Sequence, residues 1–242
     1  MEIPLHSEAR VVARHQAGLI AVDKPAGVRS HPNKPGADAK SLLGVPYDFE
    51  DECFHDGSQR WYLLNRLDAP TSGLILLATV AELARLAREA FAGRRVEKEY
   101  RALVRGRGPR REESWEDNLK VTRKGGQLRV VPARAGDPAL TRASTLQTSR
   151  QPPVVSLLSL VPKTGRTHQL RVQSALRKMP IIGDATYGDF KFNRTWYQQH
   201  GYKRLYLHSY EVNLSLKFHG AAIHLQARTP IPEAFKLYSN RD

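Results

Sequence analysis

Cysteine is almost absent from this chain, since Cys53 is the only one in 242 residues. A single thiol excludes an intrachain disulfide and a cluster of thiolate metal ligands. No apolar run approaches the roughly 18 residues that a membrane-spanning helix needs. The first six residues, MEIPLH, lack the basic start and apolar core of a secretory signal. These absences predict a cytoplasmic protein that is not embedded in a membrane.

Several fingerprints of common enzymes are also missing. The chain has no phosphate-binding loop ending in Gly-Lys-Ser/Thr, no glycine pattern for a dinucleotide and no Gly-x-Ser-x-Gly elbow. His219 and His224 are five residues apart in a strand-like region, so we expect their side chains on opposite faces. This spacing disfavours a metal site there.

Positive charge is abundant. The 38 Lys and Arg exceed the 24 Asp and Glu, which gives a formal net charge of +14. Such an excess attracts polyanions, and nucleic acid is their commonest kind. A basic surface that only aids solubility is an alternative. A membrane surface is disfavoured, because the basic residues are scattered and form no single amphipathic face.

The pattern along the chain is mostly of short strands with a few helices that do not alternate strictly with them. It predicts an α+β fold with a mixed sheet. Strands are expected on both sides of a turn at Gly18 and at 74–78, 99–104, 205–216 and 221–227, with shorter ones between 119 and 160. Helices are expected at 81–91 and within 167–178, an irregular segment at 30–60 and a surface excursion at 187–204.

Asp68 stands in a turn-rich segment, 65–73, between apolar runs. A carboxylate there must be paired or hydrogen-bonded, because burying it alone is costly. An aspartate that closes a turn with its own backbone suits the sequence Asp-Ala-Pro-Thr-Ser-Gly, and spacing alone favours this over catalysis. A hydrolase with two carboxylates stays open, although no second acidic residue has a comparable context.

Two basic segments could hold an anion. In 163–172, Arg166, His168 and Arg171 accompany a glycine turn, and arginine near a helix start can grip phosphate. An ordinary charged helix face is equally compatible with this pattern. Lys98-Glu99-Tyr100 places a ring among charges; such a tyrosine usually belongs to a core, but it can also stack on a base.

Taken together, these segments resemble the RluA family of pseudouridine synthases, in order and with similar intervals. The resemblance lies in Asp23-Lys24-Pro25-Ala26-Gly27-Val28 with His31-Pro32, Arg66-Leu67-Asp68 with Thr71-Ser72-Gly73, Lys98-Glu99-Tyr100, Thr164 to Val172, Pro180 to Asp184 with Tyr187-Gly188, and Leu207-His208-Ser209. Each segment alone is moderately specific. Their succession is highly specific and overturns the view of Asp68 as a turn residue only.

The resemblance implies a pseudouridine synthase fold, with a central, mixed, mainly antiparallel sheet of eight strands and flanking helices. It implies one catalytic domain over 1–242, with the motifs in about 19–216. The implied activity is isomerisation of specific uridines in rRNA or tRNA, without cofactor or metal. An additional N-terminal RNA-binding domain of the S4 type is expected to be absent, since about twenty residues precede the Lys-Pro turn, and a monomer is expected.

The resemblance also implies roles for single residues. Asp68 would be the nucleophile, Arg171 would pair with it, and Tyr100 would stack on the uracil and assist proton removal. Attack at the sugar, attack at the base and a glycal intermediate all stay open. Arg66 would fill the space that the extruded uridine leaves. RNA-binding or positioning roles are expected for Lys24, Lys98, Arg166, Thr167, His168 and Leu170, the last in the floor of the site.

Three residues depart from the family's usual pattern. Asn65 and Gln173 stand where histidine is common, and Ala69 where a basic residue is frequent. None of these changes removes the expected nucleophile, its arginine or the tyrosine. A catalytically silent RNA-binding protein of the same fold is the main alternative, and an RNA glycosylase that uses the same carboxylate is another.

Overall fold

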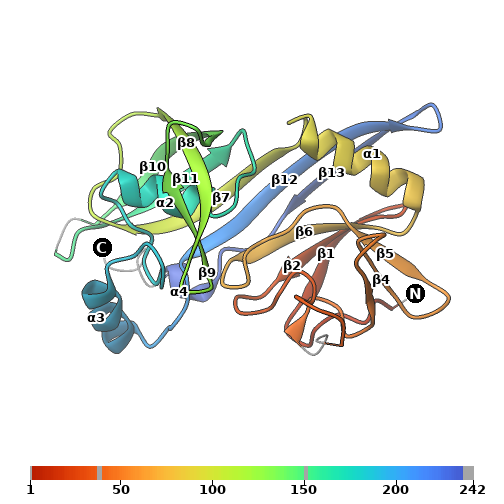
Figure 1. The fold of residues 1–242 in the computed structure, drawn as a ribbon, viewed down its shortest axis with the longest axis horizontal. Coiled ribbons are helices and arrows are strands. Elements are labelled where there is room, and N and C mark those ends of the chain that lie inside the picture. The colour runs from red at the N-terminus through yellow and green to blue at the C-terminus, as the bar shows by residue number, and fades with distance from the viewer. Residues whose placement is uncertain (1, 37–39, 150–151, 237–242) are drawn as a thin grey trace. The chain divides into compact units, whose positions relative to one another are not determined.

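The computed structural model describes residues 2–36, 40–149 and 152–236 (Figure 1). The chain divides into two compact units. The first comprises residues up to Lys98 and the segment Ser209–Pro230, and the second comprises the remainder. Two strands, β7 (Glu97–Arg105) and β12 (Leu207–Phe218), contribute residues to both units.

The first unit is a set of antiparallel strands and one helix. β6 pairs with β2 and with β5; β2 pairs with β1, β5 with β4, β4 with β3, and β12 with β13. These elements are β1 (Arg10–His15), β2 (Leu19–Lys24), β3 (Tyr47–Asp48), β4 (Cys53–His55), β5 (Arg60–Leu63), β6 (Ser72–Ala78), α1 (Ala81–Ala92) and β13 (Ala221–Arg228).

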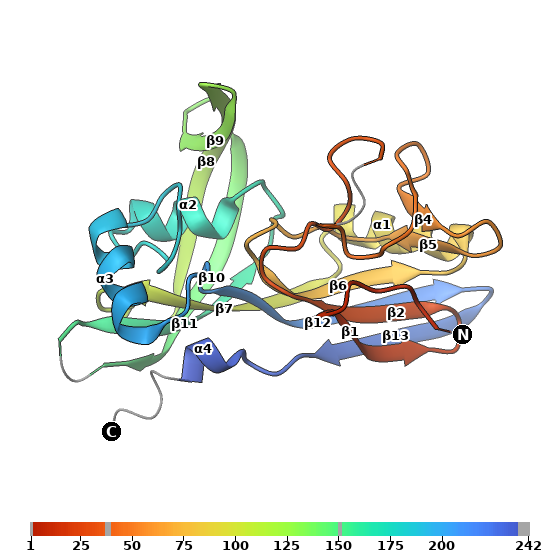
Figure 2. The same ribbon diagram turned by 90° about the horizontal axis from the view of Figure 1, so that it is seen from below.

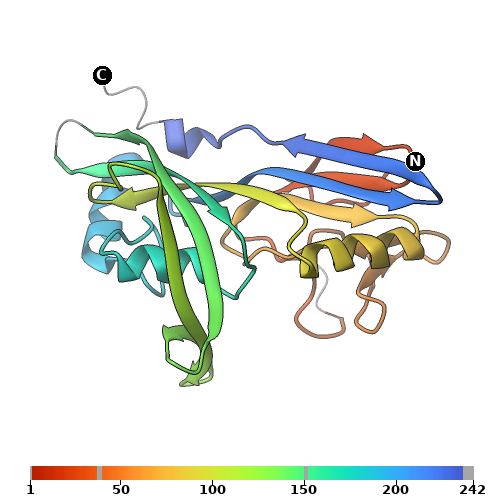
Figure 3. The same ribbon diagram turned by 90° about the horizontal axis from the view of Figure 1, so that it is seen from above.

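Strand β6 is buried along its whole length, as its unbroken apolar run predicts. Helix α1 packs against β6 and β5 (Figure 3). Its buried face consists of Leu83, Ala84, Ala87 and Ala90. The three alanines are small and allow the helix to approach the sheet closely. β2 and β6 are in register with Lys24 opposite Gly73. This register places the loops that follow β2 and precede β6 beside each other.

Gly73 at the start of β6 is required by its surroundings. Its φ is +109°, and a Cβ on it would lie 2.2 Å from the backbone oxygen of Ser209. Any side chain would therefore push β6 away from β12, next to the segment that carries Asp68.

The second unit combines a long antiparallel sheet with three helices. β11 pairs with β7 and β10, and β8 pairs with β10 and β9. The remaining elements are β8 (Glu113–Lys124), β9 (Gln127–Pro132), β10 (Asp137–Thr148), β11 (Val155–Pro162), α2 (Gln169–Leu176), α3 (Phe190–His200) and α4 (Glu233–Lys236).

Helix α2 lies against the β8 and β9 hairpin, whose tip extends past the helix (Figure 2). Val172 of α2 packs into a cluster with Leu119, Val130 and Ala139 from the hairpin and β10. The main core of this unit lies among β7, β11 and the segment 179–207, and includes Trp115, Trp196 and Tyr206. These contacts fix α2 in its own unit.

Most of the expected elements are present. The α+β class, the strands at 74–78, 99–104 and 221–227, and the helices at 81–91 and within 167–178 are confirmed. The described residues form thirteen strands where eight were expected. Short strands in the segment expected to be irregular, β3 and β4, account for part of the difference.

The surface excursion expected at 187–204 contains a helix, α3, that was not predicted, and most of its side chains are exposed. The Asp189 side chain accepts a hydrogen bond from the Phe192 N–H at the helix start, and Gly201 ends the helix with φ +79°. Both capping signals are visible in the sequence. They are hard to recognise because Trp196 is the one buried residue of this helix, so no apolar stripe accompanies them.

Candidate active site

Asp68 lies in an irregular segment between β5 and β6, where its side chain is partly buried. The neighbouring side chains alternate, with Arg66 exposed and Leu67 buried. The backbone oxygen of Asp68 accepts a hydrogen bond from the Thr71 N–H at 3.0 Å, which closes the turn before β6. The turn is therefore closed by the backbone oxygen of Asp68 and not by its carboxylate. A turn closed by the backbone of Asp68 is what the structural interpretation of this residue predicted.

Lys24 supports this segment from inside the unit. Its side chain is fully buried, and Nζ donates to the carbonyl oxygens of Pro25 at 2.9 Å, Val28 at 2.6 Å and Ala69 at 3.1 Å. The Gly27 N–H also donates to the Ala69 oxygen. A buried ammonium is tolerated only with such partners. Of the two roles expected for Lys24, phosphate contact or positioning, its burial supports positioning.

Ser30 is a second support, and sequence reasoning missed it. Its buried hydroxyl donates to the Leu67 oxygen at 2.8 Å and accepts from the Leu67 N–H at 2.9 Å. One side chain thus satisfies both backbone groups of the residue before Asp68. The only hint in the sequence is a small hydroxyl residue beside the His31-Pro32 pair.

Asn65, one of the three departures, anchors the segment to β6. Its Oδ1 accepts from the Leu76 N–H at 2.8 Å, and its Nδ2 donates to the Leu74 oxygen at 3.4 Å. An amide carries both a donor and an acceptor, so it can extend the ladder of β6 in this way. Arg66, next to it, is exposed and lies 3.8 Å from Glu52, so its side chain is accessible to a large partner.

Lys98 and Tyr100 occupy β7, on either side of the boundary between the units. Burial lowers the pKa of Lys98, whose Nζ lies 5.8 Å from the centre of the Phe91 ring. Tyr100 is partly buried and packs against the main core of the second unit. Lys98 and Tyr100 therefore place one cation and one aromatic ring on the same strand, as the sequence predicted.

Arg171 is held by an acidic residue that the motifs contain but that we did not single out. Its Nε donates to Oδ2 of Asp184 at 2.8 Å, and its Nη2 donates to Oδ1 at 2.9 Å. The two side chains are 5% and 1% exposed. Two parallel bonds between planar groups fix both distance and orientation. The guanidinium also lies 5.3 Å from the centre of the Tyr187 ring.

The carboxylate of Asp184 stays charged in this environment. Burial opposes its ionisation, but the hydrogen bonds and charge of Arg171 outweigh burial and hold its pKa below the ordinary value. The N–H groups of Thr186 and Tyr187 also donate to Oδ1, at 2.8 and 3.0 Å. Asp184 therefore orders the turn that carries Tyr187 as well as the arginine.

The turn before α2 contains three of the expected residues, and the first turn of α2 contains a fourth. Arg166 donates from Nε to the Pro138 oxygen at 3.2 Å, and Thr167 is exposed. His168 has a left-handed backbone with φ +51°, and its Nδ1 lies 2.9 Å from the Tyr187 hydroxyl. Leu170 is buried in the main core of the second unit, which is compatible with its expected place in the floor of the site.

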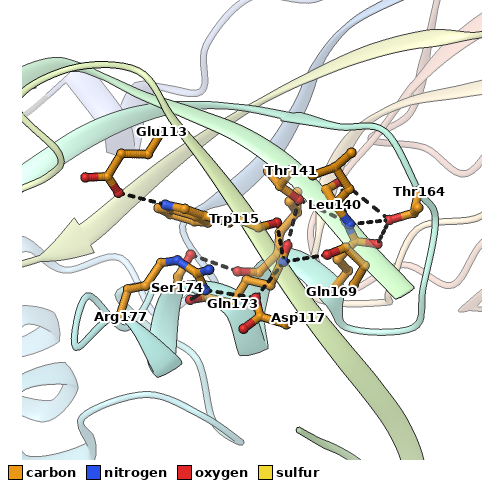
Figure 4. Close-up of polar contacts among 12 residues, drawn as sticks. Glu113, Trp115, Asp117, Leu140, Thr141, Thr164, Gln169, Gln173, Ser174 and Arg177 are labelled. Carbon is orange, nitrogen blue, oxygen red and sulfur yellow. Dashed lines mark hydrogen bonds and ion pairs between the residues drawn. The ribbon is translucent and has the colours of Figure 1, made fainter. Parts of the chain in front are cut away.

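Two buried glutamines fix α2, and one of them, Gln173, is a departure from the family's usual pattern. Gln173 receives a hydrogen bond from the Thr141 hydroxyl at 2.6 Å, and its Nε2 lies within 3.2 Å of the Trp115 oxygen, Asp117 Oδ2 and the Ala139 oxygen (Figure 4). Figure 4 also shows Gln169 joined to Thr164 and Thr141. Fully satisfied polar networks of this kind rigidify the elements they join.

The expected site residues fall into two groups. Lys24, Arg66, Asp68 and Lys98 belong to the first unit. The second unit holds Tyr100, Arg166, Thr167, His168, Leu170 and Arg171. The residues of each group belong to one unit, and a pairing of Asp68 with Arg171 would join residues of the two.

No group of three or more His, Cys, Asp or Glu could hold a metal ion in the part of the chain that the structure describes. Among the same residues, no helix is long and apolar enough to cross a membrane.

Known proteins resemble this chain in both sequence and fold. The tRNA pseudouridine synthase C of Yersinia pestis is 32% identical over 226 residues, covering 88% of this chain and 84% of that protein. The protein of the same name from Pectobacterium carotovorum subsp. carotovorum is 34% identical and matches 88% of this chain. This chain spans 57% of the length of that relative.

Solved structures agree with this likeness. Human RNA Pseudouridylate Synthase Domain Containing 1 superposes with a TM-score of 0.69 at 25% identity, covering 93% of this chain and 84% of that one. Human RNA Pseudouridylate Synthase Domain Containing 4, at 23% identity and a TM-score of 0.68, shows the same fold. The expected pseudouridine synthase fold is confirmed.

The family model described as RNA pseudouridylate synthase matches residues 18–176, which include Asp68, Tyr100 and Arg171. This match covers more than half of the chain and confirms both the expected family and the expected class of isomerase. The chain belongs to the RNA pseudouridylate synthase family, whose members are isomerases that act on RNA.

Proposed function

We propose that this chain converts specific uridines of tRNA to pseudouridine, with Asp68 as the nucleophile and both units acting as one catalytic domain. The observation that carries the proposal is the support of the Asp68 segment, where buried Lys24 and Ser30 fix the backbone on both sides of the carboxylate. A nucleophile needs such a rigid segment, because small displacements of a reacting group slow catalysis strongly. The tRNA substrate is suggested by the names of the bacterial relatives.

The reaction exchanges one bond of the uridine for another. The bond between N1 of uracil and C1′ of ribose breaks, and a bond between C5 and C1′ forms. A proton leaves C5 and N1 gains one, so nothing is oxidised or reduced. The carboxylate of Asp68 initiates bond breaking and is released at the end, while the uracil turns within the site.

Arg171 and Tyr100 would complete the site from the second unit. Asp184 orients the guanidinium through Nε and Nη2, and we propose that Arg171 pairs with Asp68 and keeps that carboxylate ionised and in position. The Tyr100 ring would stack on the uracil, and its hydroxyl would assist removal of the C5 proton. Neither role requires a metal or an organic cofactor.

Binding of the RNA would depend on the positive charge of the chain and on Arg66. The net charge of +14 favours phosphate contacts, so affinity should fall steeply with salt. Arg66 is exposed beside the Asp68 segment, where it could occupy the space left by the extruded uridine. A monomer acting in the cytoplasm fits this function.

The test uses RNA tritiated at uracil C5, as unmodified tRNA and as rRNA transcripts. Tritium release and pseudouridine in tRNA are expected with the unaltered protein, and Asp68→Asn should abolish both while RNA affinity is largely kept. Asp56→Asn is a matched control, since Asp56 caps the turn of β4 and β5 by accepting from the Ser58 and Gln59 N–H groups. That variant should retain turnover.

Each other outcome favours a different function. Binding without turnover on any cellular RNA would favour the catalytically silent RNA-binding protein. Free uracil in place of pseudouridine would favour the glycosylase. Turnover on rRNA alone would leave the chemistry intact and replace the substrate.

A further inference from the structure

An aromatic cluster in the first unit joins His31 to three rings of the hairpin formed by β3 and β4. The His31 and Tyr47 rings are stacked, with centres 5.1 Å apart and planes at 15°. Phe49 meets both edge-on, 6.3 Å from His31 and 5.1 Å from Tyr47. Phe54 contacts Tyr47 from the buried side at 4.8 Å. Four rings thus form one cluster, which the proposed catalytic step does not use.

This cluster is joined to the Asp68 segment. His31 follows Ser30, whose hydroxyl bonds both backbone groups of Leu67. Burial and the charge of Glu52 raise the pKa of Tyr47 to about 12, although the positive charge of Arg66 opposes this. Tyr47 therefore stays neutral under ordinary conditions and lies within electrostatic reach of Arg66, two residues before the proposed nucleophile.

Phe49 is the exposed member of the cluster. Its side chain is 41% accessible, whereas Phe54 is fully buried. Its ring stands nearly perpendicular to those of His31 and Tyr47, and part of it stays exposed. An aromatic ring that is already ordered loses little entropy when a flat partner stacks on it.

Both acidic and basic residues accompany Phe49 in this part of the chain. Lys34 and Lys40 are exposed in the same segment, and Arg66 is exposed beside it. Three of the four acids around Phe49 have partners. The Asp48 carboxylate accepts from the Glu50 and Asp51 N–H groups, Asp51 pairs with Arg60, and Glu52 lies within 4 Å of Arg66 and Arg88.

We propose that Phe49, braced by His31 and Tyr47, is a stacking platform for one unpaired nucleobase of the RNA substrate, next to the target uridine. This inference rests on the proposed function for the identity of the substrate. Unpaired bases are recognised by stacking on aromatic side chains, whereas paired bases in a duplex offer no free face. The platform selects single-stranded loops, with little preference among the four bases.

The test measures binding of two fluorescein-labelled RNA probes by anisotropy: an eight-nucleotide single strand and a blunt duplex with the same number of phosphates. Phe49→Ala should weaken binding of the single strand roughly tenfold and leave duplex binding unchanged, since each stacked base contributes on that scale. The slope of log affinity against log salt should stay the same, because no phosphate contact is lost.

Three further variants separate stacking from folding. Phe49→Trp should restore affinity for the single strand. Phe49→Leu keeps an apolar side chain of similar size and should fail to restore it. Phe190→Ala is the matched control, since Phe190 is a 60% exposed phenylalanine of α3, and it should bind like the unaltered protein. A Phe49→Leu variant that binds normally, or an equal loss for both probes, would overturn the platform.

The platform and the proposed function can fail separately. Binding is measured in the Asp68→Asn background, where no turnover is needed. If the unaltered protein makes no pseudouridine but Phe49 still discriminates single strand from duplex, the proposed function fails and the platform stands. If pseudouridine forms and Phe49→Ala leaves both the KM for tRNA and binding of the single strand unchanged, the platform alone fails.

Discussion

The guanidinium of Arg171 and the carboxylate of Asp184 form a two-pronged pair in which both side chains are almost completely buried. Arg171 starts from helix α2, and Asp184 lies thirteen residues later in the turn after it. An arginine held by two parallel hydrogen bonds keeps a single orientation, so a pair of this kind can present a positive charge to a third group.

Asp184 should be a positioning residue for catalysis. Asp184→Asn removes the charge and one of the two acceptors, so Arg171 should become poorly oriented. We expect kcat for pseudouridine formation to fall roughly ten- to a hundredfold, with little change in the KM for tRNA. Steady-state tritium release on tRNA measures both constants.

The control for this variant is a second, partly buried carboxylate that pairs with arginine. Glu211 accepts two bonds from Arg228, on the β12 and β13 ladder of the first unit. Glu211→Gln should leave kcat unchanged. A rise in KM with constant kcat in Asp184→Asn would show that the pair serves RNA binding instead.

The pair of Asp184 with Arg171 should also make the free energy of unfolding depend on pH in the acidic range. The pKa of Asp184 in the folded protein lies below its ordinary value of 3.8, so the unfolded chain binds the proton more readily. The stabilisation is complete above pH 3.8 and is lost as the pH falls through the folded pKa. The difference in unfolding free energy between the unaltered protein and Asp184→Asn should therefore be constant near neutrality and shrink in acid. Denaturant titrations at several pH values would contradict this if the difference stayed constant.

Removing the buried ammonium should loosen the Asp68 segment. Lys24→Met keeps the length of the side chain but leaves the carbonyls of Pro25, Val28 and Ala69 without this donor. We expect a loss of about 2–4 kcal/mol in unfolding free energy, as for other disrupted buried polar groups. Hydrogen exchange at the Gly27 amide, which bonds the Ala69 oxygen, should also accelerate.

Lys191→Met is the matched control for that experiment, because Lys191 is exposed on α3. Its effect on stability should stay within about 0.5 kcal/mol. Equal effects of the two substitutions would show that the three carbonyl contacts contribute little.

Gln173 should be needed for stability although it departs from the usual family residue. Gln173→Leu fits the space but removes the acceptor for the buried Thr141 hydroxyl and the donor to the Trp115 and Ala139 oxygens. We expect a loss of about 2–3 kcal/mol, measured by urea unfolding. Gln226→Leu replaces an exposed glutamine of β13 and should change stability little.

The parts of this fold that could be predicted from sequence have strong local patterns. The apolar run of β6 and the spaced alanines and leucines of α1 need only neighbouring residues to be recognised. Helix α3 lacks such a stripe and was missed. The motifs of the site could be located because they resemble a family, and the match to residues 18–176 confirms that family.

The supports of the site could not be predicted in the same way. Lys24 meets Ala69 across 45 positions, and Ser30 meets Leu67 across 37. Nothing in the local spacing of these residues indicates that they touch, because their contact depends on the pairing of β2 with β6. The same holds for Gln173, whose partners Trp115 and Asp117 lie more than fifty positions earlier.

Lys24 bonds to Ala69 and Ser30 bonds to Leu67, so the chain that leaves Ser30 returns to the same place at Leu67. The loops between these two points can therefore be exchanged in part. Their two ends are held side by side, so added length in the loops costs only closure entropy, about 0.6 kcal/mol for each doubling. Loops of other lengths and compositions could be grafted at the exposed residues 33–36, while the buried Leu42 and Leu43 and the carboxylate keep their places. Enzymes with altered RNA targets could thus be engineered without rebuilding the catalytic centre.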